Sequence, residues 1–132
     1  MFAGACAEWL YPCYAEFNRV TSYGDPVALR AVVDAAWSLT KLEVLSRRDI
    51  ERLRIVAELL VPKDADDNWS ILSPIAQNAA ASAAYAVRTW LLQDSQQAAW
   101  AARQLFEAGE YLVQLCAPAQ SYVALIPPSL CR

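Results

Sequence analysis

Apolar residues recur at steps of three and four along most of the chain, which is the pattern of amphipathic α-helices. In the first such segment, residues 2–20, the positions expected to face inward are Phe2, Cys6, Trp9, Leu10, Cys13 and Phe17. Four further segments show the same periodicity, and only short loops connect them. Short loops join antiparallel neighbours, so the pattern predicts an all-α, single-domain bundle of about five antiparallel helices.

Turn and capping residues divide the chain into these helices. Glycine tolerates the left-handed conformation that often ends a helix, side-chain oxygens of Ser and Asp cap the next one, and proline fits its first turn. The residues with these roles are Gly24, Asp25, Pro26, Ser46, Pro62, Ser73, Pro74 and Asp94. They place the later helices at about residues 26–42, 46–61, 73–92 and 95–115.

The fourth predicted helix carries alanine around most of its circumference. Its alanines are Ala76, Ala79, Ala80, Ala81, Ala83, Ala84 and Ala86. Small side chains allow neighbouring helices to approach closely. We therefore expect this helix at the centre of the bundle, packed on several sides.

The helical pattern ends near residue 116. Pro118, Pro127 and Pro128 exclude a long helix after that point, and the residues between them are strongly apolar. The chain is thus predicted to consist of a helical bundle domain, residues 1–116, and an extended proline-containing tail, residues 117–132. We expect the tail to pack on the bundle or on a partner.

The composition is unusually apolar. Of the 132 residues, 57% are hydrophobic and only 19% are charged, so some apolar surface is expected to stay exposed to a partner or to a second copy. The net charge is −3 and the basic residues are scattered, whereas nucleic-acid binding needs a clustered basic face. Neither a signal peptide nor a membrane-spanning run is visible. The sequence therefore predicts a cytoplasmic protein that binds neither nucleic acid nor membrane.

The four cysteines are interpreted as thiols of a reducing cytoplasm. Cys6 and Cys13 lie two turns apart on one predicted helix, about 10 Å along its axis, which is too far for a disulfide. Cys116 and Cys131 flank the tail, and a disulfide between them is the alternative if the tail folds back.

Histidine is absent, which removes the commonest general base near neutral pH and the commonest transition-metal ligand. The three glycines are isolated, so no glycine-rich phosphate loop is present. We therefore expect no catalytic residue, no metal and no cofactor.

The acidic loop between the third and fourth helices resembles the start of a calcium-binding loop. Asp64, Asp66 and Asn68 match its first ligand positions, but Trp69 stands where the loop needs glycine and Ile75 where it needs glutamate. A solvated acidic loop is the favoured interpretation.

Tryptophan beside acidic residues is typical of protein-binding hot spots. The candidate partner-binding residues are Asp64, Asp66, Asp67, Trp69, Trp90 and Trp100. The alternative is that the aromatic residues among them close the ends of the bundle as part of the core. Trp9 and Trp37, at apolar-face positions, are expected in the core.

The residues also show a family resemblance. The segment 2–17 (FAGACAEWLYPCYAEF) resembles the opening signature of the YjaG-like family of uncharacterised bacterial proteins. Further similar stretches are Gly24-Asp25-Pro26, Leu29-Arg30, Trp37, Val61-Pro62 and residues 76–80, and together they cover about residues 2–115. The resemblance implies an all-α cytoplasmic bacterial protein, a domain of unknown function without an established activity.

Two hypotheses about function follow. The favoured one is a protein-binding domain without catalysis, most specifically an immunity or antitoxin protein that occludes the active site of a toxin or effector. The sequence is also compatible with a homodimer. An acidic loop would steer it to a basic toxin site. The alternative is a small-molecule binder or enzyme with an interhelical pocket around Glu8, Cys13, Tyr14 and Asp34.

Overall fold

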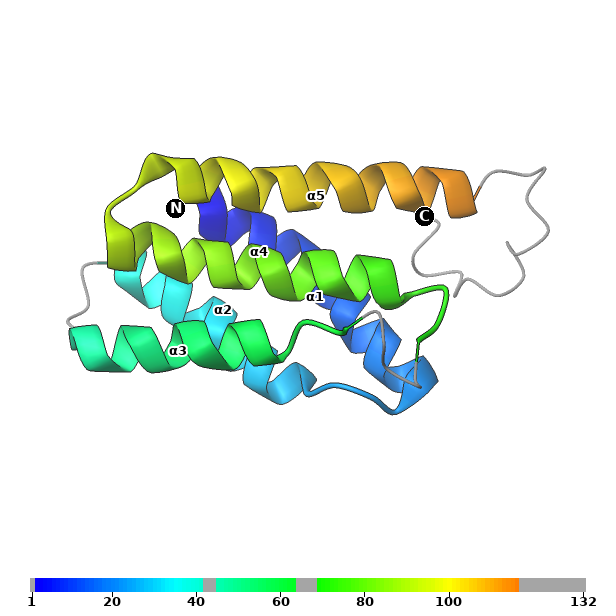
Figure 1. Ribbon diagram of the computed structural model, residues 1–132, viewed down its shortest axis with the longest axis horizontal. Helices are drawn as coiled ribbons and strands as arrows, with labels where there is room; N and C mark the ends of the chain where they lie inside the picture. Colours follow the sequence, from blue (N-terminus) through cyan, green and yellow to red (C-terminus); the bar gives the residue numbers. More distant parts are fainter. Residues whose placement is uncertain (1, 42–44, 64–68, 117–132) are drawn as a thin grey trace.

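The computed structural model describes residues 2–41, 45–63 and 69–116. Over these residues the secondary structure consists of five helices: α1 (Phe2–Thr21), α2 (Pro26–Thr40), α3 (Arg47–Leu59), α4 (Ser73–Leu92) and α5 (Ser95–Leu115). Helices α3, α4 and α5 lie side by side, and α1 and α2 cross behind them (Figure 1). The predicted all-α bundle is confirmed. The predicted tail, residues 117–132, lies outside the described part of the chain.

Three of the predicted caps hold the starts of helices. The side chain of Asp25 accepts a hydrogen bond from the backbone N–H of Ala28 at 3.0 Å and so caps α2. Ser46 caps α3 in the same way, and Asp94 caps α5. Gly24, before the first of these caps, has a φ of +85°, a left-handed conformation that favours glycine.

The start of α4 differs from the prediction. Leu72 occupies the capping position and makes no capping bond through its side chain, while Ser73 is already the first helical residue. The hydroxyl of Ser73 instead accepts a hydrogen bond from the backbone N–H of Ser70 at 2.7 Å. The serine therefore stabilises the turn before the helix rather than the helix end itself.

Helix α4 is the centre of the bundle, as predicted. It contacts all four other helices, and its buried alanines are Ala76, Ala79, Ala80, Ala83, Ala84 and Ala86. Because a methyl group occupies little space, α1 and α5 can approach its backbone closely along its length.

Tyr14 ties the helices together inside this core. Its ring is fully buried and packs on Phe17, with 5.9 Å between the ring centroids. Its hydroxyl donates a hydrogen bond to the carbonyl of Leu60 at 3.0 Å and accepts one from the N–H of Asp25 at 3.4 Å. One side chain of α1 thus holds the end of α3 and the start of α2.

Two of the residues expected to face inward on α1 are exposed. Trp9 is 76% exposed and Phe2 also faces solvent, so the prediction of a core role for Trp9 is wrong. The side of α1 that contacts the bundle includes Ala3 and Ala7, which lie in buried clusters with alanines of α4, and Gly4, which faces Trp37 of α2. Trp37, also expected in the core, is partly buried against it.

The cysteines divide into two kinds. Cys6 and Cys13 are free and buried, as predicted. Cys116 is disulfide-bonded, so the interpretation of all four cysteines as thiols is wrong for this residue. Cys131 lies outside the described residues.

Candidate protein-binding surface

The structure separates the residues that the sequence grouped as one binding site. Trp69 precedes α4, whereas Trp90 lies near the end of the same helix, whose 20 residues span about 30 Å. Trp100 lies on α5 and packs against Tyr85 of α4 in a tilted arrangement, with 5.7 Å between the ring centroids. Trp69 and Trp100 are exposed and Trp90 is half-buried. These tryptophans therefore do not form one surface, and the three candidate aspartates, Asp64, Asp66 and Asp67, lie outside the described residues.

A different set of large apolar side chains is exposed on α1. Phe2, Ala5, Trp9 and Pro12 follow one another at steps of three and four, so they lie along one side of the helix, and none of them is charged. Three of them are exposed and Ala5 is half-buried, and the next residue on this side is the charged Glu16. We call these four residues the α1 stripe. Trp9, at 76% exposure, is its largest side chain.

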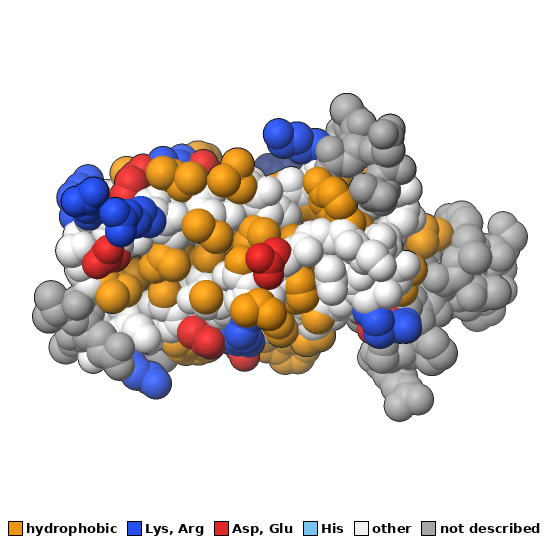
Figure 2. Space-filling model, turned by 90° about the horizontal axis from the view of Figure 1, so that it is seen from below, with side chains coloured by type: hydrophobic (Ala, Val, Ile, Leu, Met, Phe, Trp, Pro, Cys, Tyr) orange, Lys and Arg blue, Asp and Glu red, His pale blue; other side chains and the backbone are white. Residues whose placement is uncertain are grey.

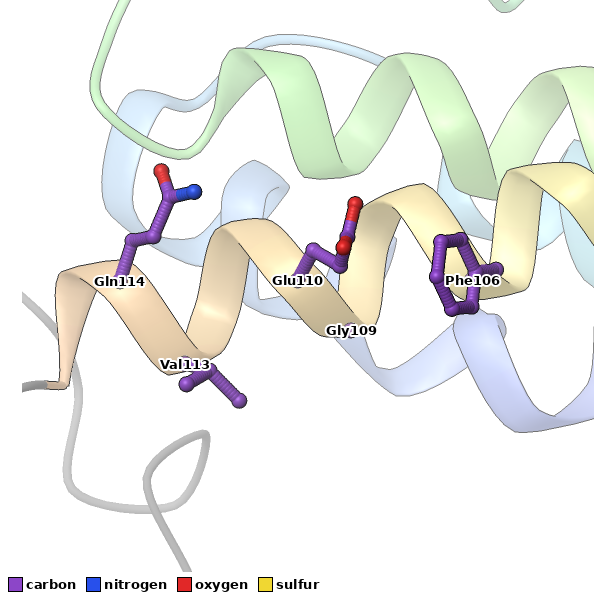
Figure 3. Close-up of a pocket in the computed structure, with 5 residues that line it drawn as sticks. All are labelled: Phe106, Gly109, Glu110, Val113 and Gln114. Carbon is purple, nitrogen blue, oxygen red and sulfur yellow. The ribbon is translucent and has the colours of Figure 1, made fainter.

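A second exposed row runs along α5. It consists of Ala99, Ala102, Phe106, Gly109 and Val113, again at steps of three and four, and we call it the α5 stripe. All of these residues are exposed except Ala102, which is half-buried against the cluster that contains Ala101. Phe106 is 66% and Val113 73% exposed. Figure 3 shows the part of this row that lines a shallow pocket, with Glu110 and Gln114 pointing away from Val113.

The two stripes lie on helices that pack against each other. Ala3 and Cys6 of α1 belong to the same cluster of buried residues as Ala101 of α5, and Leu105 packs against that cluster. The exposed rows on α1 and α5 therefore belong to neighbouring elements of the bundle surface.

Other exposed apolar side chains are mixed with charges. Val27 on α2 is 79% exposed, and Leu59 on α3 is exposed too. Figure 2 looks onto the lower side of the molecule of Figure 1, where hydrophobic side chains lie among acidic and basic ones. On α3 itself, Arg54 pairs with both Glu51 and Glu58. On this side of the molecule and on α3, exposed apolar side chains are thus mixed with charges, whereas the residues of the two stripes are all uncharged.

The residues of the alternative hypothesis form two separate groups. Arg30 bonds the carboxylates of Glu8 and Asp34, with 2.9 Å between its Nε and Oδ1 of Asp34. The hydrogen bond from Arg30 lowers the pKa of Glu8 against a smaller opposing effect of burial, and the charge of Arg30 and a hydrogen bond from Trp37 lower it further. This exposed ion-pair group joins α1 to α2.

Cys13 and Tyr14, the other two of these residues, are core side chains. Burial raises the pKa of both groups, so the thiol and the phenol stay protonated near neutral pH. Among the described residues, no group of three or more Cys, Asp or Glu side chains is placed to hold a metal ion. No described helix has both the length and the apolarity needed to cross a membrane.

Sequence reasoning missed the two stripes for a physical reason. Apolar residues cover more than one side of α1 and α5, and spacing alone does not tell which side meets the bundle. The available signal was the apolar composition, which predicted exposed apolar surface without placing it.

Comparisons of the chain with protein-family models, with curated proteins and with solved structures found no match. The resemblance to the YjaG-like family therefore stays a prediction.

Proposed function

We propose that this chain is a non-catalytic protein-binding domain that docks its partner on the α1 stripe. The observation that carries the proposal is the exposure of Trp9 at 76% on a side of α1 that has no charged residue between Phe2 and Pro12. A tryptophan buries about 150–250 Å² when covered, which corresponds to a gross gain of about 4–6 kcal/mol at roughly 25 cal/mol per Å². Tryptophan is also among the residues most enriched in binding hot spots.

The more specific form of the proposal is an immunity or antitoxin protein that occludes the active site of a toxin. The net charge of −3 and the acidic sequence from Asp64 to Asp67 support it, because an acidic protein associates faster with a basic target. The cytoplasmic location belongs to this proposal as well. The disulfide at Cys116 weighs against the cytoplasmic location, since stable disulfides are rare in reducing compartments.

The titratable side chains are used in ways that suit a binding domain. Arginines pair with the carboxylates of Glu8, Glu16, Glu51, Glu58 and Glu107. Burial keeps the two described thiols, Cys6 and Cys13, in their protonated, unreactive form. These groups stabilise helices and leave shape and apolar surface for recognition.

The test is to produce the tagged chain together with each protein encoded beside it in the source genome. We expect one of them to form a stable complex and, in the immunity form of the proposal, to lose its toxicity to the host cell. Trp9→Ser should abolish the complex. Val27→Ser should leave it intact, because Val27 is equally exposed but lies on α2. Loss of the complex in both variants, or in neither, contradicts a docking role for the α1 stripe.

A further inference from the structure

The α5 stripe has the spacing of a helix that packs along another helix. Ala99, Ala102, Phe106, Gly109 and Val113 follow the three-four repeat of positions a and d in a coiled coil. Within the chain, α5 already contacts α1 and α4 through other sides, since its buried residues are Gln97, Ala101, Ala108 and Leu115. Apart from Ala102, which is half-buried against the core, the stripe is therefore an outward-facing row of about two heptads.

The stripe contains a large side chain next to an open notch. Phe106 projects from the surface, whereas a Cβ atom added to Gly109 would meet no atom of the described residues within 4 Å. Because the two positions are one turn apart on the same row, a helix carrying this sequence offers both a knob and a hole.

We infer that the α5 stripe is the interface of a symmetric homodimer, in which α5 packs antiparallel against α5 of a second copy. A two-fold axis between Phe106 and Gly109 places Phe106 of each copy in the notch at Gly109 of the other. The same axis places Ala102 opposite Val113 of the second copy. Each of these layers combines one large and one small residue, which is the self-complementarity that a two-fold interface requires.

The parallel arrangement lacks this fit. It would bring Phe106 beside Phe106 and Gly109 beside Gly109, so that one layer is crowded and the next leaves a void. Size complementarity along the stripe thus selects the antiparallel pair.

The charges along one edge of the stripe agree with the same axis. Arg103 and Glu110 lie two turns apart on that edge and both are exposed, and Arg103 also pairs with Glu107 of its own helix, with 2.8 Å between its Nε and Oε1 of Glu107. The axis brings Arg103 of one copy within about two residues, or 3 Å of axial rise, of Glu110 of the other. Two identical pairs, each of Arg103 from one copy and Glu110 from the other, therefore flank the interface, one on each side of the axis.

The α5 stripe is distinct from the α1 stripe of the proposed function, so either can fail without the other. Trp9→Ser should leave the dimer intact while it removes the partner. Gly109→Leu should remove the dimer while the chain still binds its partner.

The experiment is sedimentation equilibrium of the full chain between about 1 and 500 µM, a range that covers weak and strong self-association. We expect a dimer of twice the 14.6 kDa chain mass. Gly109→Leu fills the notch and should give a monomer. Because leucine is a far better helix former than glycine, a folding defect cannot explain the loss of the dimer. Circular dichroism should show undiminished helicity for this variant.

Charge reversal provides a second, independent test. Arg103→Glu and Glu110→Arg should each raise the dimer dissociation constant about tenfold, because each puts like charges face to face. The double variant restores opposite charges and should return the constant to near the wild-type value. A wild-type chain that is monomeric throughout the range overturns the inference, whatever else covers the stripe. So does a dimer that is indifferent to Gly109→Leu or that is not rescued by the double reversal.

Discussion

The contact between Tyr14 and Gly24 allows a quantitative test of the core. Tyr14→Phe removes the hydroxyl that bonds the carbonyl of Leu60 and the N–H of Asp25. The ring is fully buried, whereas the two hydrogen bonds are partly buried. An ordinary hydrogen bond contributes about 0.5–1.5 kcal/mol, so we expect the loss of both bonds to lower the free energy of unfolding by about 1–3 kcal/mol.

Gly24→Ala perturbs the same contact from the other side. The backbone there has a φ of +85°, which costs an alanine about 1–2 kcal/mol. Its Cβ would also lie 2.7 Å from the hydroxyl oxygen of Tyr14, and relieving such an overlap in a packed core costs about 1–3 kcal/mol. The expected total is therefore about 2–5 kcal/mol.

The two substitutions should not be additive. Without the hydroxyl, the nearest atom to the new Cβ is Cζ of Tyr14 at 3.1 Å, so much of the overlap disappears. We expect the double variant to lose about 1–2 kcal/mol less than the sum of the single losses, as contacting residues commonly do. Urea unfolding followed by circular dichroism measures all four chains. Additivity within about 0.5 kcal/mol would refute the contact.

Two further results are expected. Glu8→Gln should lower stability near neutral pH by less than about 1 kcal/mol, since the carboxylate is 43% exposed. Arg30 lowers the pKa of Glu8 in the folded state, so the ionised carboxylate stabilises the fold at pH values above its unfolded pKa. This stabilisation is lost as the pH falls through the folded pKa, and the stabilities of wild type and variant should therefore converge in acid. A constant difference from pH 7 to pH 2 would contradict this. For the cysteines, alkylation of the native chain should be slow at Cys6 and Cys13, because burial both shields these thiols and raises their pKa. Unfolding without reductant should expose both to the reagent but not Cys116, and alkylation of Cys116 under those conditions would disprove its disulfide.

The sequence was sufficient for the elements that local chemistry determines. Asp25, Ser46 and Asp94 cap the helices that they were predicted to cap, because a short side-chain oxygen bonds the free N–H groups of the next turn. The central position of α4 was also predictable, since an alanine-rich helix can be approached from several sides.

The orientation of α1 was not predictable in the same way. Phe2 and Trp9 share the helical spacing of buried residues such as Cys13, but they are exposed. What decides between them is the distance to α4, because Ala3 and Ala7 lie in buried clusters with alanines of that helix and such small side chains allow two helices to approach closely. That distance is a property of the assembled bundle rather than of the helix sequence.

The candidate binding surfaces could be located only from the exposure of side chains in the folded chain. Sequence reasoning chose Trp69, Trp90 and Trp100 because of their acidic neighbours and their place near helix ends, but α4 separates Trp69 from the other two. Exposure of aromatic residues depends on how whole helices pack, so the α1 and α5 stripes became visible only in the folded chain.

The most direct test of a docking role for α1 is oxidative footprinting of Trp9 with and without the bound partner. In the free chain, hydroxyl radicals should modify this exposed indole readily. In the complex, we expect its modification to fall several-fold, while Leu59, an exposed side chain on α3, is modified as before. Undiminished modification of Trp9 in a fully formed complex would show that the partner binds elsewhere.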